Sequence, residues 1–326
     1  TVPPMTAVYI TIDTEYSAGL AVELGRHARA EVYARSIAGR TAAGDVGIEY
    51  QMDMMDAHGI AGVFFVDPMP ALVWGVEAVA AVVEPILARG HEVQLHLHPE
   101  WLELAGDANP LKGRTGRNLN AFSEDEQVEL IELARAFLVE AGAPAPTAFR
   151  AGNYGADDAT LRALRRLDIR YDSSHVPGIA GSDCRISLGA ADRAVILHEG
   201  TIEVPVSAIR SFGGLRHAQI TALSHWEMAA ALQFCVRAGV EMLNIVSHSF
   251  ELMSRDRLQI NAIVRDRFAR FCRTIAETQG ARSATFTSRP PAIGDQTGAG
   301  TMPHNPLRTG ARMAEQLWAN RLYGGG

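Results

Sequence analysis

The chain has 326 residues, of which 47% are hydrophobic and 21% charged, and its formal net charge is −7. This is the composition of a globular protein long enough for one large α/β barrel or two smaller domains. The negative charge and the lack of a basic run argue against nucleic-acid binding and against adhesion to an anionic membrane. No stretch reaches the roughly 18 continuous apolar residues of a membrane span. The three widely spaced cysteines argue against a disulfide scaffold and favour a reducing compartment.

The N-terminal residues, Thr1-Val2-Pro3-Pro4, show no basic segment followed by an apolar one, which a signal peptide requires. We therefore expect a cytoplasmic protein, with a periplasmic location as the alternative if a leader has been removed. The sequence leaves the oligomeric state open, and a homo-oligomer is compatible with it.

Strand and helix patterns alternate along most of the chain. The predicted strands are compact apolar or alternating segments: Ala7–Asp13, Ile60–Val66, Glu92–His98, Thr147–Arg150, Ile169–Asp172, Thr201–Val206, Glu241–Ser247 and Ser283–Thr287. The predicted helices lie between them: Val46–His58, Val76–Arg89, a helix that a capping box at Ser123 begins and that runs to about Ala141, Asp157–Leu167, Trp226–Ala238 and Leu258–Gln279. This alternation predicts parallel strands covered by helices, and closure into a barrel fits the length.

Two segments stand apart from this alternation. The first, Gly19–Asp45, is an insertion rich in Arg and Ala with weak helical periodicity, and its arginines form a solvated helical face or, as the less favoured alternative, contact an anionic ligand. The second, residues 291–326, is rich in Pro and Gly and has a short helical pattern near Met313–Tyr323. We expect residues 1–290 to form the barrel and the tail to be an arm packed on its surface or on a partner.

The most informative segment is Gly90–Trp101, which reads GHEVQLHLHPEW. Because side chains alternate along a strand, His96 and His98 point to the same side of it, and Pro99 ends the strand just after them. Neutral imidazole is the commonest protein ligand for zinc and similar ions, so this pair indicates a metal site. The alternative, about equally probable from the pair alone, is two hydrogen-bonded histidines at a sheet edge.

Polar residues also follow other predicted strands. Asp13 and Glu15 lie at the end of the first strand, Arg150 ends the fourth, and His248 follows Glu241–Ser247. In a parallel α/β barrel these strand ends share one rim. Leaving such charges there without partners would cost several kcal/mol each, so a bound cation and an Arg–carboxylate pair explain the cluster best.

Six segments, in this order, resemble the motifs of the polysaccharide deacetylase family, also called the NodB-homology or carbohydrate esterase family 4. They are TIDTE (Thr11–Glu15), GHEVQLHLHP (Gly90–Pro99), FRAGNYG (Phe149–Gly155), RYDSS (Arg170–Ser174), EVPVS (Glu203–Ser207) and NIVSHSFE (Asn244–Glu251). The resemblance implies a distorted (β/α)7 barrel that holds one divalent metal, usually zinc, on an Asp-His-His triad. It also implies hydrolysis of the N-acetyl group of an amino sugar.

The resemblance assigns roles to individual residues. Asp13 is similar to the catalytic base of the family and His248 to the histidine that protonates the leaving amine. Arg150 matches the arginine that orients the base. The turn at Asn153-Tyr154 is expected to offer a backbone N–H to the developing oxyanion.

The sequence departs from the family at two metal ligands. The family often has Asp-Asp in the first motif, but here Thr14 follows Asp13, so the ligand role falls to Glu15, on the same face of the strand. In the second motif Glu100 occupies the position of the later histidine. Besides His96, the third ligand is therefore His98, which we favour because Pro99 turns the backbone away just after it, or Glu100.

The expected function is that of a metal-dependent N-deacetylase acting on a saccharide or glycan precursor, with a divalent ion such as Zn²⁺ that activates water. Two alternatives are hydrolysis of another linear or cyclic amide and a catalytically silent glycan-binding module. Trp101 and Tyr154 either stack on a sugar ring or pack in the core or at the rim. For Asp172 and Glu203, a structural role is at least as probable as a catalytic one.

Overall fold

A computed structural model describes residues 5–179, 181–294 and 300–324, so the N-terminal tetrapeptide considered above and part of the Pro/Gly-rich tail lie outside the described residues. Within these ranges nine strands form one sheet in the order β12-β1-β4-β5-β6-β7-β9-β8, with β13 also paired to β1. The strands of this sheet are β1 (Thr6–Thr14), β4 (Val63–Val66), β5 (Glu92–Leu97), β6 (Ala148–Ala151), β7 (Tyr171–Asp172), β8 (Ile196–His198), β9 (Thr201–Glu203), β12 (Met242–His248) and β13 (Ala281–Ser283). Two short hairpins lie outside it: β2 (Arg40–Thr41) with β3 (Gly44–Asp45), and β10 (Ala208–Ser211) with β11 (Gly214–His217).

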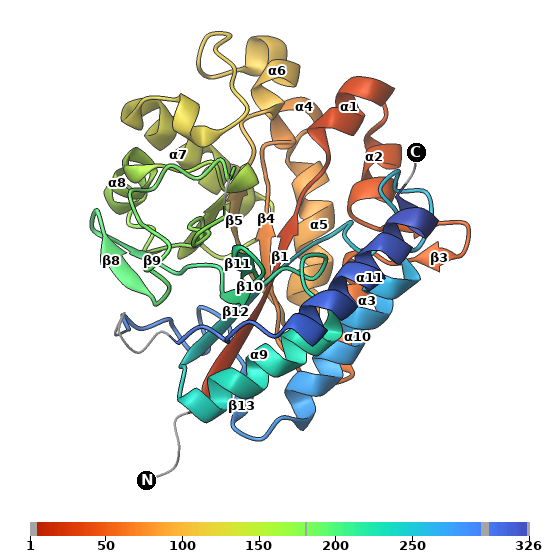
Figure 1. The fold of residues 1–326 in the computed structure, drawn as a ribbon. Helices are drawn as coiled ribbons and strands as arrows, with labels where there is room; N and C mark the ends of the chain where they lie inside the picture. Colours follow the sequence, from red (N-terminus) through yellow and green to blue (C-terminus); the bar gives the residue numbers. More distant parts are fainter. Residues whose placement is uncertain (1–4, 180, 295–299, 325–326) are drawn as a thin grey trace.

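The α-helices surround this sheet. They are α1 (Ala18–Leu24), α2 (Arg29–Ser36), α3 (Ile48–Asp56), α4 (Ala71–Trp74), α5 (Val76–Ala88), α6 (Trp101–Ala105), α7 (Glu124–Glu140), α8 (Asp158–Arg166), α9 (His225–Ala238), α10 (Ala262–Glu277) and α11 (Pro306–Tyr323). Figure 1 shows α9, α10 and α11 side by side on one flank of the molecule and α7 and α8 on the opposite flank.

The sheet curves into a barrel, and hydrogen bonds between Asn244 of β12 and the segment after β9 close it. All neighbouring pairs from β12 through β1, β4, β5, β6 and β7 to β9 are parallel, which makes seven consecutive parallel strands. No ladder joins β9 to β12 within the described part of the chain, but Ser207, just beyond β9, donates its backbone N–H to the carbonyl of Asn244 in β12 at 3.2 Å. The predicted parallel barrel is thus present in distorted form.

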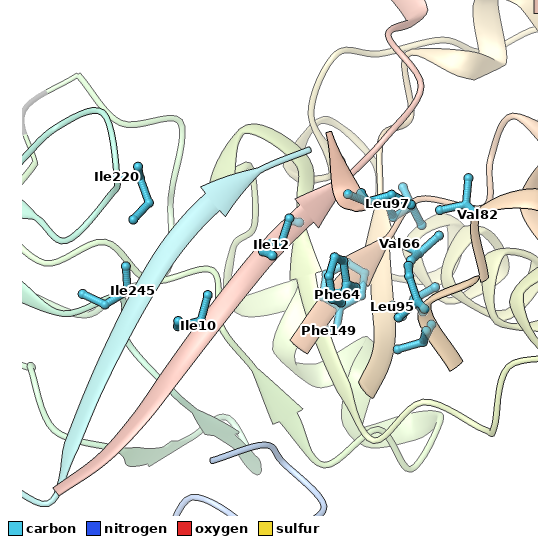
Figure 2. Packing of buried hydrophobic residues seen from close by; sticks show 14 of the residues in the cluster. Ile10, Ile12, Phe64, Val66, Val82, Leu95, Leu97, Phe149, Ile220 and Ile245 are labelled. Carbon is cyan, nitrogen blue, oxygen red and sulfur yellow. The ribbon is translucent and has the colours of Figure 1, made fainter. Parts of the chain in front are cut away.

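Strand alternation gives the sheet an apolar outer face and an inner face that carries both polar residues and a smaller apolar cluster, which includes Phe65 and Val204. On β1, Ile10 and Ile12 pack with Phe64 and Leu95 in the main hydrophobic cluster, which also includes the surrounding helices (Figure 2). The alternate residue Thr11 points inward, where its hydroxyl donates to the carbonyl of Ile245 at 2.9 Å. Burying the outer face holds the helices on the barrel, while the inner face also has room for the polar groups near the strand ends.

Local signals explain most element boundaries. The capping box predicted at Ser123 is present, because its hydroxyl accepts from Glu126 N while the Glu126 carboxylate accepts from Ser123 N. The C-terminal helix α11 is longer than the sequence pattern predicted, since Asn305 caps it and Pro306 occupies its first turn. The helix packs on α9 through a buried ion pair of 3.1 Å between Arg312 and Glu227.

The last predicted strand differs in the structure, whereas the insertion has the helical character that its periodicity indicated. The last strand was predicted at Ser283–Thr287 but is β13, Ala281–Ser283, because the backbone N–H groups of Phe286 and Thr287 donate to the Glu92 carboxylate instead of to a neighbouring strand. The Arg- and Ala-rich insertion consists of two short helices, α1 and α2, and the β2–β3 hairpin. At the last strand, contacts with the distant Glu92 outweigh local propensity.

Two buried carboxyl groups, Asp172 on β7 and Glu203 on β9, face each other in register, and both side chains are fully buried. Burial raises the pKa of Glu203 well above its usual range, and the neighbouring Asp172 raises it further. The pKa of Asp172 is raised as well, chiefly by burial. The pair therefore carries a proton at pH values where the unfolded chain would be ionised.

We expect the free energy of unfolding to fall as pH rises above the ordinary carboxyl pKa of about 4.3 toward the raised folded-state pKa, since only the unfolded chain gains ionisation there. A Glu203→Gln variant should flatten this dependence, because the amide cannot ionise in either state. Urea unfolding across this pH range compares the two proteins. Parallel stability curves would contradict the expectation.

Candidate metal centre and active site

The sheet brings the polar strand ends together on one rim. In the strand register, Asp13 of β1 pairs with His248 of β12, and His96 of β5 pairs with Arg150 of β6. Because these strands are parallel and consecutive, their carboxyl ends open at the same mouth of the barrel. Inward alternation points the Asp13, His96 and Arg150 side chains into that mouth.

Glu15, His96 and His98 converge on one point. The Oε2 atom of Glu15 lies 2.5 Å from Nε2 of His98 and 3.2 Å from Nε2 of His96. One ligand atom from each of the three side chains lies within 4.8 Å of the others. Both imidazoles are buried, whereas Glu15 is partly exposed at the mouth. The predicted ligand set is therefore close enough to share one cation.

The outer nitrogen of each imidazole is already occupied. Nδ1 of His96 lies 2.7 Å from the carbonyl oxygen of Arg150, and Nδ1 of His98 lies 3.0 Å from Oε2 of Glu100. Metal-bound histidines are commonly oriented in this way, by a carbonyl or carboxylate on the nitrogen that does not bind the metal. The two Nε2 atoms and the Glu15 carboxylate form a donor set that fits a zinc-type divalent ion.

The same geometry bears on the choice between His98 and Glu100. Glu100 contacts the side of the His98 ring that faces away from Glu15, so it supports that ring instead of joining the three converging groups. Gly152 fixes the ring from another side, since a Cβ atom at this position would lie 2.6 Å from two atoms of the imidazole. The geometry therefore favours His98.

Glu15 and His98 shift each other's pKa values in opposite directions. Burial opposes ionisation of Glu15, but the two imidazoles outweigh it and hold the pKa of Glu15 well below its usual range. Burial likewise opposes protonation of His98, but Glu15 and Glu100 outweigh it and raise the pKa of His98 well above its usual range. A divalent cation would displace the proton from Nε2 of His98 on binding, as metals generally do at such sites.

Asp13 is held by Arg150. The guanidinium of Arg150 is fully buried and donates from Nη1 to Oδ1 of Asp13 at 2.6 Å. Its Nε donates to the carbonyl of Ser173 at 3.0 Å, and its Cζ lies 4.4 Å from the centre of the Phe65 ring. These contacts leave Oδ2 of Asp13 facing Nε2 of His248 at 3.9 Å. The predicted base and acid are thus neighbours on the adjacent strands β1 and β12, with their side chains facing each other.

His248 is supported by Glu251, a residue to which sequence reasoning gave no role. Oε2 of Glu251 lies 3.6 Å from Nδ1 of His248 and accepts the His248 backbone N–H at 3.0 Å. Gln219 and Thr221 donate to the other carboxylate oxygen, each at 2.5 Å. Burial opposes protonation of His248, but Glu251 and the more distant Asp13 outweigh it and raise the pKa of His248 to about 9. The imidazole is therefore protonated at neutral pH.

Asp67 was also missed by sequence reasoning. It follows β4 at the same rim, where its Oδ1 accepts from Met69 N at 3.1 Å and from His98 N at 3.4 Å. Its Oδ2 is buried and has no hydrogen-bond partner in the described part of the chain. Burial raises the pKa of Asp67 to about 6, against the lowering effect of the two nearby imidazoles. The signal was present in the sequence, as an acidic residue directly after the apolar run IAGVFFV.

The turn at Asn153 and Tyr154 has an unusual backbone. Both residues have φ of 55°, a left-handed conformation that non-glycine residues rarely adopt and that is often retained at functional sites. The Tyr154 hydroxyl is buried without a partner in the described residues, and burial raises its pKa. The side chain therefore lies largely within the protein, while the strained backbone lies at the mouth next to β6.

Trp101 does not lie on the surface. Its side chain is 0% exposed and packs edge-on against Trp74, with ring centres 5.0 Å apart. Stacking on a sugar ring was one of two interpretations of this residue, and the burial corrects it in favour of core packing. The reason is tertiary, because α4 supplies the ring that covers the indole.

Comparisons with known proteins extend these observations. No family model and no curated protein matches the chain. Among solved structures, a candidate polysaccharide deacetylase from Mycobacterium smegmatis is similar with a TM-score of 0.57 and 14% identity, covering 90% of this chain and 95% of that one. The 4-alpha-glucanotransferase from Thermococcus litoralis is similar with a TM-score of 0.51 and 10% identity, covering 87% of this chain and 40% of that one. A family 4 carbohydrate esterase from Streptomyces lividans has a TM-score of 0.44 and 13% identity, covering 90% of this chain and 100% of that one.

The likeness to the Mycobacterium smegmatis protein concerns the fold alone. Together with the parallel strands, it confirms the predicted fold class, a distorted (β/α) barrel of the NodB polysaccharide deacetylase type. Within the described residues, none of the helices has both the length and the apolar character needed to cross a membrane.

Proposed function

We propose that this protein is a metal-dependent hydrolase that removes the N-acetyl group from an amino sugar. The observation that carries the proposal is the convergence of Glu15, His96 and His98 beside an acid and a base that face each other. The likeness in fold to a candidate polysaccharide deacetylase supports it further. A silent binding module would have no need to keep both catalytic groups oriented at this mouth.

The chain's own residues have distinct tasks in this reaction. Glu15, His96 and His98 would hold the ion, which when bound polarises the amide carbonyl and acidifies water. Asp13, fixed by Arg150 through Oδ1, takes a proton from the attacking water at Oδ2. The water oxygen bonds to the carbonyl carbon as the carbon–nitrogen bond breaks, and acetate leaves.

His248 completes the proton transfers. Its protonated imidazole gives a proton to the departing amine nitrogen, so the sugar product is a free amine. The carboxylate of Glu251 stabilises the protonated form before the transfer. The backbone turn at Asn153 and Tyr154 is the proposed donor of an N–H to the carbonyl oxygen as charge develops on it.

Acetate release tests the proposal. Purified protein loaded with zinc should release acetate and an equal amount of amine from at least one member of a panel of N-acetylated saccharides. Chelation should stop the reaction, and adding the metal back should restore it. Protein that binds the metal yet releases no acetate from any saccharide would reject this substrate class. Faster hydrolysis of non-sugar amides in the same assay would favour the alternative amide hydrolase.

A further inference from the structure

A guanidinium group without an anionic partner lies beside the proposed active site. Arg257 is in the segment that follows β12, and its side chain is only partly exposed. Its Nη1 donates to Oγ of Ser36 at 3.0 Å, and its Cζ lies 3.7 Å from the centre of the Phe250 ring. No carboxylate in the described part of the chain is within ion-pair distance of it, although Arg150, Arg267 and Arg312 all have such partners.

Its contacts with Phe250 and Ser36 place Arg257 near both the proposed acid and a proposed metal ligand. The Phe250 ring lies 5.4 Å from the imidazole of His248, the proposed acid. The Ser36 hydroxyl also accepts the backbone N–H of Ser17, two residues beyond the proposed ligand Glu15, at 3.2 Å. The guanidinium therefore lies at the edge of the active site, between the segment carrying the acid and the segment carrying a ligand.

Burial makes the surroundings of this cation unfavourable. It lowers the pKa of Arg257; Glu15 opposes this in part, and the nearby Arg35 adds a smaller lowering effect. Arg35 also has a buried Nε with no hydrogen-bond partner among the described residues. Two neighbouring arginines that share no carboxylate are a common arrangement for binding carboxylate or phosphate.

The backbone of Arg257 is held in a strained conformation. The residue has φ of 58°, which is rare for a side chain larger than glycine. The turn is fixed by Asp256, whose carboxylate accepts from the Ser254 hydroxyl and from Leu258 N, and whose carbonyl accepts from Nη2 of Arg35. Strain of this kind persists where the surrounding structure determines it, and it is concentrated at ligand sites.

We propose that Arg257, with Arg35 behind it, binds an oxyanion of the substrate, so that the protein acts on an N-acetylated sugar carrying a carboxylate or a phosphate. This inference rests on the proposed function and names its substrate class. In a chain with net charge −7, a local pair of cations is needed to attract such a substrate. It also revises the interpretation of the insertion, because one of its arginines, Arg35, belongs to this pair.

Calorimetry on zinc-loaded protein tests the proposal without requiring turnover. The probes are N-acetylglucosamine, which is neutral, N-acetylglucosamine 1-phosphate and N-acetylmuramic acid, which carry a phosphate and a carboxylate. We expect at least one charged probe to bind about 10- to 100-fold more tightly than the neutral sugar, as lost charge-assisted hydrogen bonds would predict. The two charged probes distinguish phosphate from carboxylate as the source of the oxyanion.

Variants then locate this preference. Arg257→Gln should abolish it, Arg257→Lys should restore it in part, and Arg255→Gln, at an exposed arginine of the same turn, should leave it intact. Equal affinity of the wild type for charged and neutral probes, or a preference that survives both Arg257 variants, would overturn the proposal. Acetate release is scored separately, so a protein that prefers charged probes but releases no acetate from any of them rejects only the proposed function.

Discussion

Replacing His98 by alanine is expected to lower the affinity for a divalent metal by more than about 100-fold. His98 supplies one of three converging donors, and its Nε2 lies 2.5 Å from the Glu15 carboxylate. Loss of a residue that merely supports a ligand typically costs 10- to 100-fold in affinity, so loss of the ligand itself should cost more. Titration with zinc, together with elemental analysis after dialysis, measures the change, and acetate release should disappear with the metal.

The matched control is Glu100→Gln. Glu100 contacts the Nδ1 side of His98, so its loss should reduce the affinity by about 10- to 100-fold and leave a site that still fills at high metal concentration. If Glu100→Gln abolished metal binding while His98→Ala preserved it, the third ligand would be Glu100 and not His98. Comparing the two variants therefore decides between the alternatives that the sequence left open.

Replacing His248 by glutamine is expected to lower kcat by about 10²- to 10⁴-fold, which is the usual contribution of a positioned proton donor. Metal content should not change, because His248 does not belong to the converging donor set. In the proposed mechanism the active form of the wild type has a protonated His248 imidazole. The rate should therefore fall as pH rises through the His248 pKa of about 9. Rate measurements from neutral to alkaline pH, with zinc content checked at each pH, reveal this fall, which is the alkaline limb of the pH–rate profile.

Glu251→Gln is the companion variant. The negative charge of Glu251 is what raises the pKa of His248, so its removal should move the alkaline limb to lower pH while the metal stays bound. A His248→Gln protein with an undiminished kcat would exclude this histidine as the donor. If the His248→Gln protein kept the same alkaline limb, another group would be responsible for it.

The sequence alone determined the fold class and the rim at which the proposed site residues lie. Alternating strand and helix patterns require parallel strands, and parallel strands place all their carboxyl ends on the same side. The spacing of two residues between His96 and His98 requires a common direction within one strand, and the structure has both Nε2 atoms beside Glu15. These inferences hold because they depend on local periodicity, which the rest of the chain does not alter.

Only the tertiary structure decided which neighbours each side chain has. Trp101 lies in the core because Trp74, from a different helix, covers it. Gly152 lies against the ring of His98, which is more than fifty residues earlier in the sequence. Arg257 donates a hydrogen bond to Ser36, which is 221 residues earlier. Contacts of this kind arise when separate elements pack, so no window of sequence contains them. Glu251 is only three residues from His248, but the contacts of its carboxylate with Gln219 and Thr221 appear only in the structure. Asp67 was marked in the sequence only by its place after an apolar run, and its contact with the backbone N–H of His98, 31 residues away, likewise appears only in the structure.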